Sequence, residues 1–530
     1  MAQYSLMKHQ RKGVKFLKKM DGVAALLFEP GVGKTGTTLA YIDFLTKIYG
    51  HVRVLVVSPL TAADTWVLQA PLFMDTPVKS RMLQGRTADL LPKIAKAKDW
   101  MAVPKMKIGV DHPGEDDRAL EGHKVTILSM SAGSISSWCS NAGEVTRAQR
   151  TAQMKTAIRR YSPHLIVVDE SHIIKSNTAN ISLAMAHLGT LAPHRIILTG
   201  TVMPHSPLDV YGQWRFLAPW TFSDHHGKKK TKKPRLLTEK ELSKMRPWSF
   251  ERFRNRYAVM GGFEGKVPVE FPPHALKHLR KRIAERSMVI RKRDALDLPP
   301  ITDMNIYVDP APAERKAYHE MKENLLAQAE SGELIEAPNA LSKMMKLRQI
   351  TAGFVKDTET QEHHVLGGSK IKALKEITDV RLIGENRIVV FAYFKFECAR
   401  IAEALKQNGR TVEVITGSTK PNERLAIRDR FKRVEDYPEP QILVAQAKTM
   451  ALSVNELVTA CHAIYMSYSE QRDVWQQSRD RLDRNGQTRP VTFWNLLVRG
   501  SIDEVMLATH QERGDMEASV LDHIRSADSI

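Results

Sequence analysis

The stretch VAALLFEPGVGKTGTTLAYIDFL, residues 23–45, decides the fold, because an apolar strand passes through a glycine loop into a helical pattern. Such a loop can turn backbone N–H groups toward an anion. We expect Lys34 to supply a cation for nucleotide phosphates and Thr35 a hydroxyl for Mg²⁺. The full phosphate-loop pattern has glycine where Phe28 stands, so an ordinary glycine turn is the alternative. The predicted phosphate-binding residues are Gly31, Val32, Gly33, Lys34 and Thr35.

A second apolar strand pattern, in LIVVDESHIIKS (165–176), stops on two adjacent carboxylates. Burying a charge is costly unless something compensates it. With a phosphate loop upstream, Asp169 is expected to hold the hydration shell of Mg²⁺, and Glu170 to orient and deprotonate an attacking water. The alternative is that the two carboxylates cap a helix that follows a buried strand.

Apolar strand patterns alternate with helical patterns in two parts of the chain. This alternation predicts an α/β protein with two parallel-sheet domains. The expected strands are 23–28, 52–58, 125–130, 165–170 and 195–200 in the first domain, and 387–394, 411–416, 441–446, 462–467 and 491–497 in the second.

The intervening sequence is basic and largely helical in pattern. Helices are expected over 248–257, 279–293, 311–330 and 338–350, with a break at the prolines of 297–303 and a surface insertion at 86–122. Three aromatic residues, Trp248, Phe250 and Phe253, alternate with arginines. We expect them to pack in a core, with base stacking as the alternative.

The chain of 530 residues carries 79 Lys and Arg against 59 Asp and Glu, a net charge of +20. This excess favours a polyanionic partner, most often nucleic acid, over the alternative of a solvated basic surface. The tract GKKKTKKPR (227–235) is expected to be a flexible basic loop, with contact to phosphate and a purely solvated loop as equal alternatives. No base-reading module is visible, so binding without sequence specificity is expected.

The 3 cysteines form no CxxC pair, which suggests neither a zinc ribbon nor a disulfide framework. They fit a reducing compartment. No apolar stretch is long enough to span a bilayer, and the first residues carry no signal core. The expectation is a soluble cytoplasmic protein without membrane contact.

Four segments resemble, in their order, the motifs of superfamily-two helicases and translocases: EPGVGKT (29–35), DESH (169–172), LTGT (198–201) and QSRDRLDRNGQ (477–487). The last is very similar to the QxxxRxxRxGQ motif of Swi/Snf-type ATPases. The resemblance covers nearly the whole chain and implies a compact member of phage or bacterial type. It implies two RecA-like lobes with helical insertions, divided as 1–218 (first lobe), 219–300 (basic insertion), 301–368 (helical linker) and 369–530 (second lobe).

The resemblance also implies roles for residues outside the two carboxylate and glycine motifs. In KHQRKGVKFL (8–17), Gln10 would hydrogen-bond adenine. Thr199 and Thr201 would couple the nucleotide state to the nucleic-acid track.

Arg481 and Arg484 would be arginine fingers that reach the γ-phosphate from the second lobe, with Gln477 at the same interface. A guanidinium stabilises the charge that phosphoryl transfer spreads over oxygen atoms. The alternative for the arginines is a surface helix with salt bridges to Asp480 and Asp483.

These implications combine into a monomeric motor that hydrolyses ATP with Mg²⁺ and moves along or remodels duplex DNA. One alternative is an RNA-dependent DExH ATPase. Another is a nucleic-acid-binding scaffold with a weak motor, because TMALSVNEL (449–457) lacks the glycines of the family's fifth motif and only Asn455 matches its asparagine.

Overall fold

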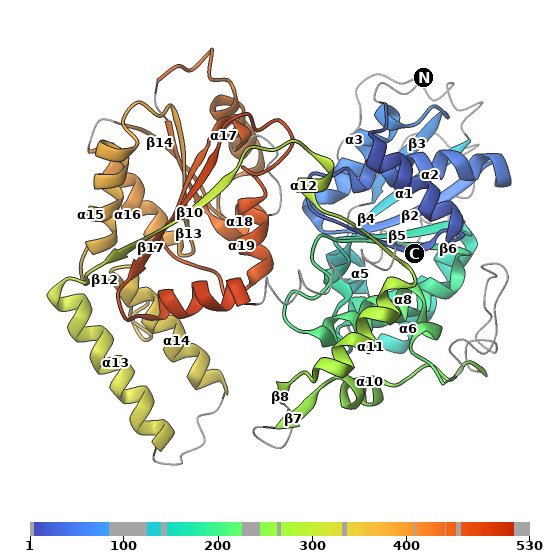
Figure 1. Ribbon diagram of the computed structural model, residues 1–530, viewed down its shortest axis with the longest axis horizontal. Coiled ribbons are helices and arrows are strands. Elements are labelled where there is room, and N and C mark those ends of the chain that lie inside the picture. The colour runs from blue at the N-terminus through green and yellow to red at the C-terminus, as the bar shows by residue number, and fades with distance from the viewer. Residues whose placement is uncertain are drawn as a thin grey trace. The chain divides into compact units, whose positions relative to one another are not determined.

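The computed structural model describes residues 5–83, 124–138, 146–224, 244–261, 267–330, 337–407, 410–439, 441–451 and 457–512. Its contacts divide the chain into two compact units, one ending at Leu296 and the other beginning at Asp297 (Figure 1). Each unit contains one large parallel sheet, so the predicted α/β class with two parallel-sheet lobes is confirmed.

The first unit is built on a seven-stranded sheet in the order β3-β4-β2-β5-β6-β1-β9, and each neighbouring pair is parallel. Its strands are β1 (Val23–Phe28), β2 (Val52–Ser58), β3 (Val78–Leu83), β4 (Val125–Ser131), β5 (Leu165–Asp169), β6 (His194–Leu198) and β9 (Ser287–Ile290). Its longer helices are α1 (Lys8–Lys19), α2 (Lys34–Tyr49), α3 (Ala63–Phe73), α5 (Ala132–Trp138), α6 (Arg147–Tyr161), α7 (Asn180–Leu188), α8 (Val210–Leu217), α10 (Phe250–Tyr257) and α11 (Pro273–Ala284). Shorter elements are the hairpin of β7 (Val259–Gly261) with β8 (Val267–Glu270) and the helix α12 (Lys292–Ala295).

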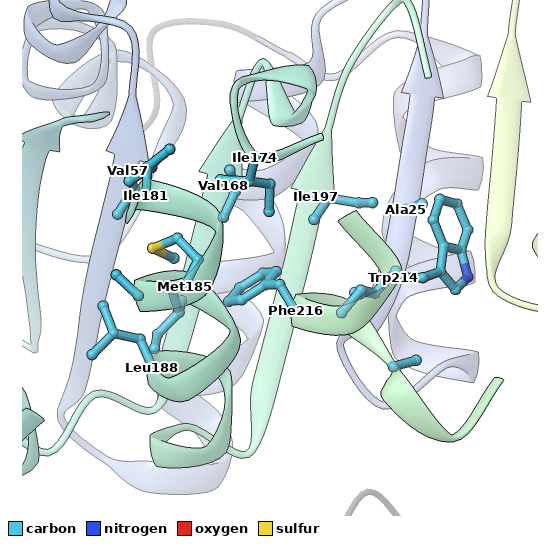
Figure 2. Packing of buried hydrophobic residues seen from close by; sticks show 14 of the residues in the cluster. Ala25, Val57, Val168, Ile174, Ile181, Met185, Leu188, Ile197, Trp214 and Phe216 are labelled. Atoms are coloured by element: carbon cyan, nitrogen blue, oxygen red, sulfur yellow. The ribbon is translucent and has the colours of Figure 1, made fainter. Parts of the chain in front are cut away.

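Helices cover both faces of this sheet, which is why its central strands are largely apolar and buried. Along β1, Ala25 and Leu27 join one core while Leu26 and Phe28 join another, as the alternation of side chains in a strand requires. The first core packs against α7 and α8, where Figure 2 shows Met185, Leu188, Trp214 and Phe216 beside the strand residues. The second core packs against α1, α2 and α3.

The second unit is built on a six-stranded parallel sheet in the order β10-β17-β16-β13-β15-β14. Its strands are β10 (Ile301–Val308), β13 (Arg387–Ala392), β14 (Thr411–Ile415), β15 (Gln441–Gln446), β16 (His462–Tyr465) and β17 (Val491–Val498). The other elements are α13 (Pro312–Glu330), α14 (Ala337–Thr351), the hairpin of β11 (Phe354–Lys356) and β12 (His363–Val365), α15 (Ser369–Glu376), the π-helical turn η9 (Ile377–Arg381), α16 (Lys395–Lys406), α17 (Pro421–Lys432), α18 (Ala447–Ala451) and α19 (Arg472–Arg479). Two cores again lie on the two faces of the sheet.

All ten predicted strands are present, with ends shifted by at most a few residues. The helical prediction for 279–293 is right for α11 and wrong for β9, which extends the first sheet beside β1. Strand β10 lies in the segment assigned to the helical linker. The contacts separate two units and do not resolve the four predicted parts, so that finer division stays a prediction.

The aromatic residues of 248–257 pack in the core, as predicted. Phe253 is fully buried, with its ring centroid 4.9 Å from that of Phe222, and Trp248 and Phe250 pack against the same cluster.

Three predicted features lie outside the described residues: the insertion at 86–122, the basic tract at 227–235, and Asn455 of the fifth motif. In the part of the chain that is described, no helix combines the length and apolarity that crossing a membrane requires.

Candidate active site

The glycine loop after β1 has the backbone conformation that its sequence predicts. Gly31 and Gly33 adopt φ angles of 84° and 86°, in the left-handed region that favours glycine. Lys34 is buried at the start of α2, and its Nζ donates to the carbonyl oxygen of Phe28 at 3.0 Å. The Phe28 side chain, which stands where the phosphate-loop pattern has a glycine, is fully buried in the core that packs against α1. Thr35, the second residue of α2, is half-buried.

Helix α1 lies directly against this loop. His9 Nε2 donates to the carbonyl oxygen of Val32 at 2.9 Å, and Gln10 Nε2 donates to that of Gly33 at 3.4 Å. Gln10 Oε1 accepts from the backbone N–H of Met7 at 2.8 Å, which fixes the amide. A Cβ atom at Gly33 would lie 2.0 Å from Gln10 Nε2, which shows how closely the Gln10 side chain packs on the loop. Gln10 therefore supports the loop, and its contact with adenine stays a prediction.

The two carboxylates follow β5 in different environments. Asp169 is buried, its Oδ2 accepts from Trp66 Nε1 at 2.9 Å, and its Oδ1 accepts from the backbone N–H of Glu170 at 3.0 Å. Burial, together with the neighbouring charge of Glu170, raises the pKa of Asp169, and the positive charge of Lys34 opposes this rise. In the parallel sheet only β6 separates β1 from β5, so Lys34, which follows β1, and Asp169, which ends β5, lie at the same carboxyl edge.

Glu170 adopts a φ angle of 49°, which is unusual for a residue with a side chain. Such backbone strain costs on the order of 1–3 kcal/mol and is concentrated at functional sites. The Glu170 side chain makes no capping hydrogen bond to the short helix η4 (Ser171–Ile174), so the alternative of a capping carboxylate is not what the structure shows. Its Oε2 lies 3.4 Å from His172 Nδ1.

The TGT segment closes a tight turn beside the glycine loop. Thr199 Oγ1 donates to the carbonyl oxygen of Thr201 at 2.8 Å and accepts from the Thr201 backbone N–H at 3.0 Å. A Cβ atom at Gly200 would lie 2.7 Å from Pro30 Cδ, so the turn packs directly on the loop that precedes Lys34.

Gln213 of α8 joins the TGT segment to the carboxylate segment. Its Oε1 accepts from Ser171 Oγ at 2.7 Å, and its Nε2 donates to the carbonyl oxygen of Val202 at 2.7 Å. Gln213 and Ser171 are fully buried, so these bonds hold the residues after Asp169-Glu170 and after Thr201 at a fixed separation.

The arginine motif lies in the second unit, at and beyond the end of α19. Gln477 is half-buried on this helix, whereas Arg481 and Arg484 are half-buried in the turns that follow it. The alternative of a surface helix through both arginines is wrong, because α19 ends at Arg479. Gln487 Nε2 donates to the carbonyl oxygens of Ala460 at 2.9 Å and Leu482 at 3.3 Å, which holds the chain in a turn.

Arg479 was not predicted as a site residue, and it anchors the arginine motif to the sheet of the second unit. Its two terminal nitrogens donate to the carboxylate oxygens of Asp303 on β10 at 2.6 and 2.7 Å. Its guanidinium also lies 3.8 Å from the centre of the Phe493 ring. Two-point pairing fixes geometry as well as charge, so Arg479 orients the start of the turn that carries Arg481. Its position in the motif between Gln477 and Arg481 is the only sequence signal.

A second polar cluster in this unit has donor atoms close enough to hold a metal: Glu385, Cys461 and His462. Arg489 already donates to Glu385 Oε1 at 2.6 Å, and burial raises the pKa of the Cys461 thiol to about 11. Trp494 Nε1 donates to His462 Nδ1 at 3.4 Å. Because an indole only donates, a neutral His462 carries its hydrogen on Nε2, which is then unavailable as a ligand. We therefore assign this cluster a structural role.

The family model described as the SNF2-related domain matches residues 9–353, which is well over half of the chain. The chain belongs to this family. An uncharacterized ATP-dependent helicase of Mycoplasma genitalium is 23% identical to this SNF2-related chain over 365 residues, covering 68% of the chain and 31% of the relative. The DNA annealing helicase and endonuclease ZRANB3 of Mus musculus is 22% identical over 517 residues, covering 97% of the chain and 41% of the relative. The chain thus spans less than half the length of either relative.

A solved structure, the Sulfolobus solfataricus SWI2/SNF2 ATPase core in complex with dsDNA, matches with 19% identity and a TM-score of 0.38, covering 100% of this chain and 94% of that one. This score is too low to add to the assignment, which follows from the family match alone.

Proposed function

We propose that this SNF2-related chain is an ATP-dependent DNA motor that moves along or remodels duplex DNA without sequence specificity. The observation that carries the proposal is the juxtaposition in the first unit of the glycine loop, the buried Lys34 and the buried carboxylate of Asp169. Family membership supports the same function.

The residues of the first unit fit a nucleotide with its magnesium ion. The loop presents two left-handed glycines and the first turn of α2, whose N-terminal N–H groups suit phosphate. Lys34 would pair with the β- and γ-phosphates, and Thr35 and Asp169 would hold Mg²⁺ or its water ligands. When bound, Mg²⁺ neutralises charge on the phosphate oxygens.

Glu170 would take the proton of the attacking water, since its strained backbone lies next to the carboxylate that serves the metal. Arg481 and Arg484 would stabilise charge on the γ-phosphate when the two units close, with Gln477 at the same interface. Gln10 would hydrogen-bond adenine. Thr199 and Thr201 would carry changes at the nucleotide toward the DNA through the turn that packs on Pro30.

The choice of DNA as the track is supported by the +20 net charge and by the printed names of the relatives, among them a DNA annealing helicase. Lys and Arg contacts to phosphate would give affinity that falls with salt and ignores base sequence. We propose that the motor acts as a monomer in the cytoplasm.

The test is steady-state ATP hydrolysis by the purified chain with duplex DNA, single-stranded DNA or RNA, beside a Lys34→Ala variant. Stimulation by duplex DNA that the variant lacks is the expected result. Stimulation by RNA and not by duplex DNA would make the chain an RNA-dependent ATPase instead. Hydrolysis no faster than that of the variant, with any nucleic acid, would make it a binding scaffold.

A further inference from the structure

The carboxylate of Asp169 is held by the side chain of a tryptophan on α3. Trp66, in the first turn of α3, donates its indole N–H to Asp169 Oδ2 at 2.9 Å. The two residues lie 103 positions apart, and the bond is buried. Trp66 is fully buried, so no water competes for this donor.

The position of Trp66 is itself fixed by the sheet. Ser129 of β4 donates its hydroxyl to the carbonyl oxygen of Ala63, the first residue of α3, at 2.8 Å, and this bond is also buried. The indole ring packs in the core that α2 and α3 share with the sheet. Trp66 therefore presents its N–H from a rigid support.

The two hydrogen bonds leave the carboxylate in a defined state. Each oxygen of Asp169 accepts one protein donor, from Trp66 or from the Glu170 backbone, and each retains further lone-pair capacity. Two donors on two oxygens fix the plane of the group. A carboxylate held in this way can contact a metal or its water ligands without a further loss of side-chain conformational entropy.

A comparison within the same unit shows that a buried tryptophan does not by itself require such a partner. Trp214 on α8 is also fully buried, in the core of Figure 2. Its Nε1 has no hydrogen-bond partner among the described residues. The burial of Trp66 alone therefore does not account for its hydrogen bond to Asp169.

We propose that Trp66 is a positioning residue for magnesium: its indole N–H holds Asp169 in the orientation that receives Mg²⁺ together with ATP. This inference rests on the proposed function, because it assigns a support to the carboxylate that serves the metal. Partners that orient metal-binding groups typically change metal affinity by about 10- to 100-fold when they are removed.

The experiment measures binding of a fluorescent ATP analogue to the full chain, in EDTA and across a Mg²⁺ titration. Trp66→Phe keeps an aromatic ring and removes the donor. We expect its half-saturating Mg²⁺ concentration to rise about 10- to 100-fold, with nucleotide affinity in EDTA within about twofold of wild type. Trp214→Phe, the same substitution at an equally buried site, should leave the Mg²⁺ dependence unchanged.

A double-mutant cycle separates positioning from a general effect on the core. In an Asp169→Asn background, Trp66→Phe should have a much smaller effect on the Mg²⁺ dependence, because the charged group that the indole N–H orients is gone. If Trp66→Phe fails to fold, benzothienylalanine at position 66 keeps the ring shape and removes only the N–H.

Three results would overturn the inference: wild-type Mg²⁺ dependence in the Trp66 variants, an equal effect of Trp214→Phe, or an undiminished effect in the Asp169→Asn background. Failure of the wild-type chain to bind the nucleotide at all would instead overturn the proposed function, and the inference with it.

Discussion

Glu170 combines an unusual backbone conformation with the proposed role of general base. Glu170→Gln keeps the size and most contacts of the side chain and removes its ability to accept a proton. We expect ATP binding to remain and single-turnover hydrolysis to fall by about 10²- to 10⁴-fold, the usual contribution of a general base. Hydrolysis at the wild-type rate would remove Glu170 from that role.

His164 is expected to make the stability of the first unit depend on pH. Its Nδ1 accepts from the backbone N–H of Arg53 at 3.0 Å, and burial, with the nearby Arg53 charge, lowers its pKa from 6.5 to about 4. Between pH 6.5 and about pH 4, the His164 imidazole is protonated in the unfolded chain and neutral in the folded chain. The stabilisation is therefore complete above about pH 6.5 and is lost as the pH falls toward 4.

His164→Asn offers an acceptor oxygen that does not titrate. The variant should lose less thermal stability than wild type between pH 7.5 and pH 5, as measured by the unfolding midpoint. His319→Asn is the matched control, because that side chain is 74% exposed. An identical loss in wild type and His164→Asn would show that His164 does not contribute to the pH dependence.

Residue patterns allowed Lys34, Asp169 and Glu170 to be singled out, since a strand, a glycine loop and a helix are encoded by neighbouring positions. The partners of these residues could not be found in this way. Trp66 and Asp169 are joined across 103 positions, and no local pattern records such a contact. Arg479 similarly depends on Asp303, a residue of a strand that was not predicted.

Helix α8 is the element that joins two motifs of the site, through Gln213. Gln213→Leu would leave Ser171 Oγ and the Val202 carbonyl oxygen buried without this partner, at a cost of about 1–3 kcal/mol each. We expect ATP binding to persist and the stimulation of hydrolysis by DNA to fall about tenfold, a coupling loss of about 1.4 kcal/mol. The measurement is the ratio of hydrolysis rates with and without duplex DNA.

Tyr211→Phe is the control on the same helix, since it removes only a hydroxyl that donates to the Trp248 carbonyl oxygen at 3.1 Å. An unchanged ratio in Gln213→Leu, or an equal fall in Tyr211→Phe, would mean that α8 does not transmit the coupling.

In both large sheets, central strands could be predicted from the sequence better than edge strands. Strands buried on both faces are apolar throughout, and such runs are visible. The missed strands of the two large sheets, β3, β9 and β10, all lie at sheet edges. In β10 most side chains are exposed, so no apolar run marks it, and β9 has only four residues directly after a basic helix.

The whole molecule has its proposed catalytic groups in two units that the chain connects near Leu296. Two α/β domains could be predicted because the sequence of each contains its own series of apolar strand patterns.

Arg484→Ala tests the contribution of the second unit. We expect ATP affinity to remain within about threefold, and the DNA-stimulated rate to fall by about 10³-fold or more, as for other arginine fingers. The control is Arg499→Ala, an exposed arginine of the same unit paired with Asp309. A large loss of ATP affinity would mean that Arg484 binds the ground state instead.

The most direct test of the motor is displacement of the third strand from a DNA triplex, run beside strand separation on a matched duplex. We predict that ATP drives triplex displacement by the wild-type chain, that Lys34→Ala abolishes it, and that the matched duplex stays paired. Absence of ATP-dependent displacement, with duplex DNA bound and ATP present, would contradict it.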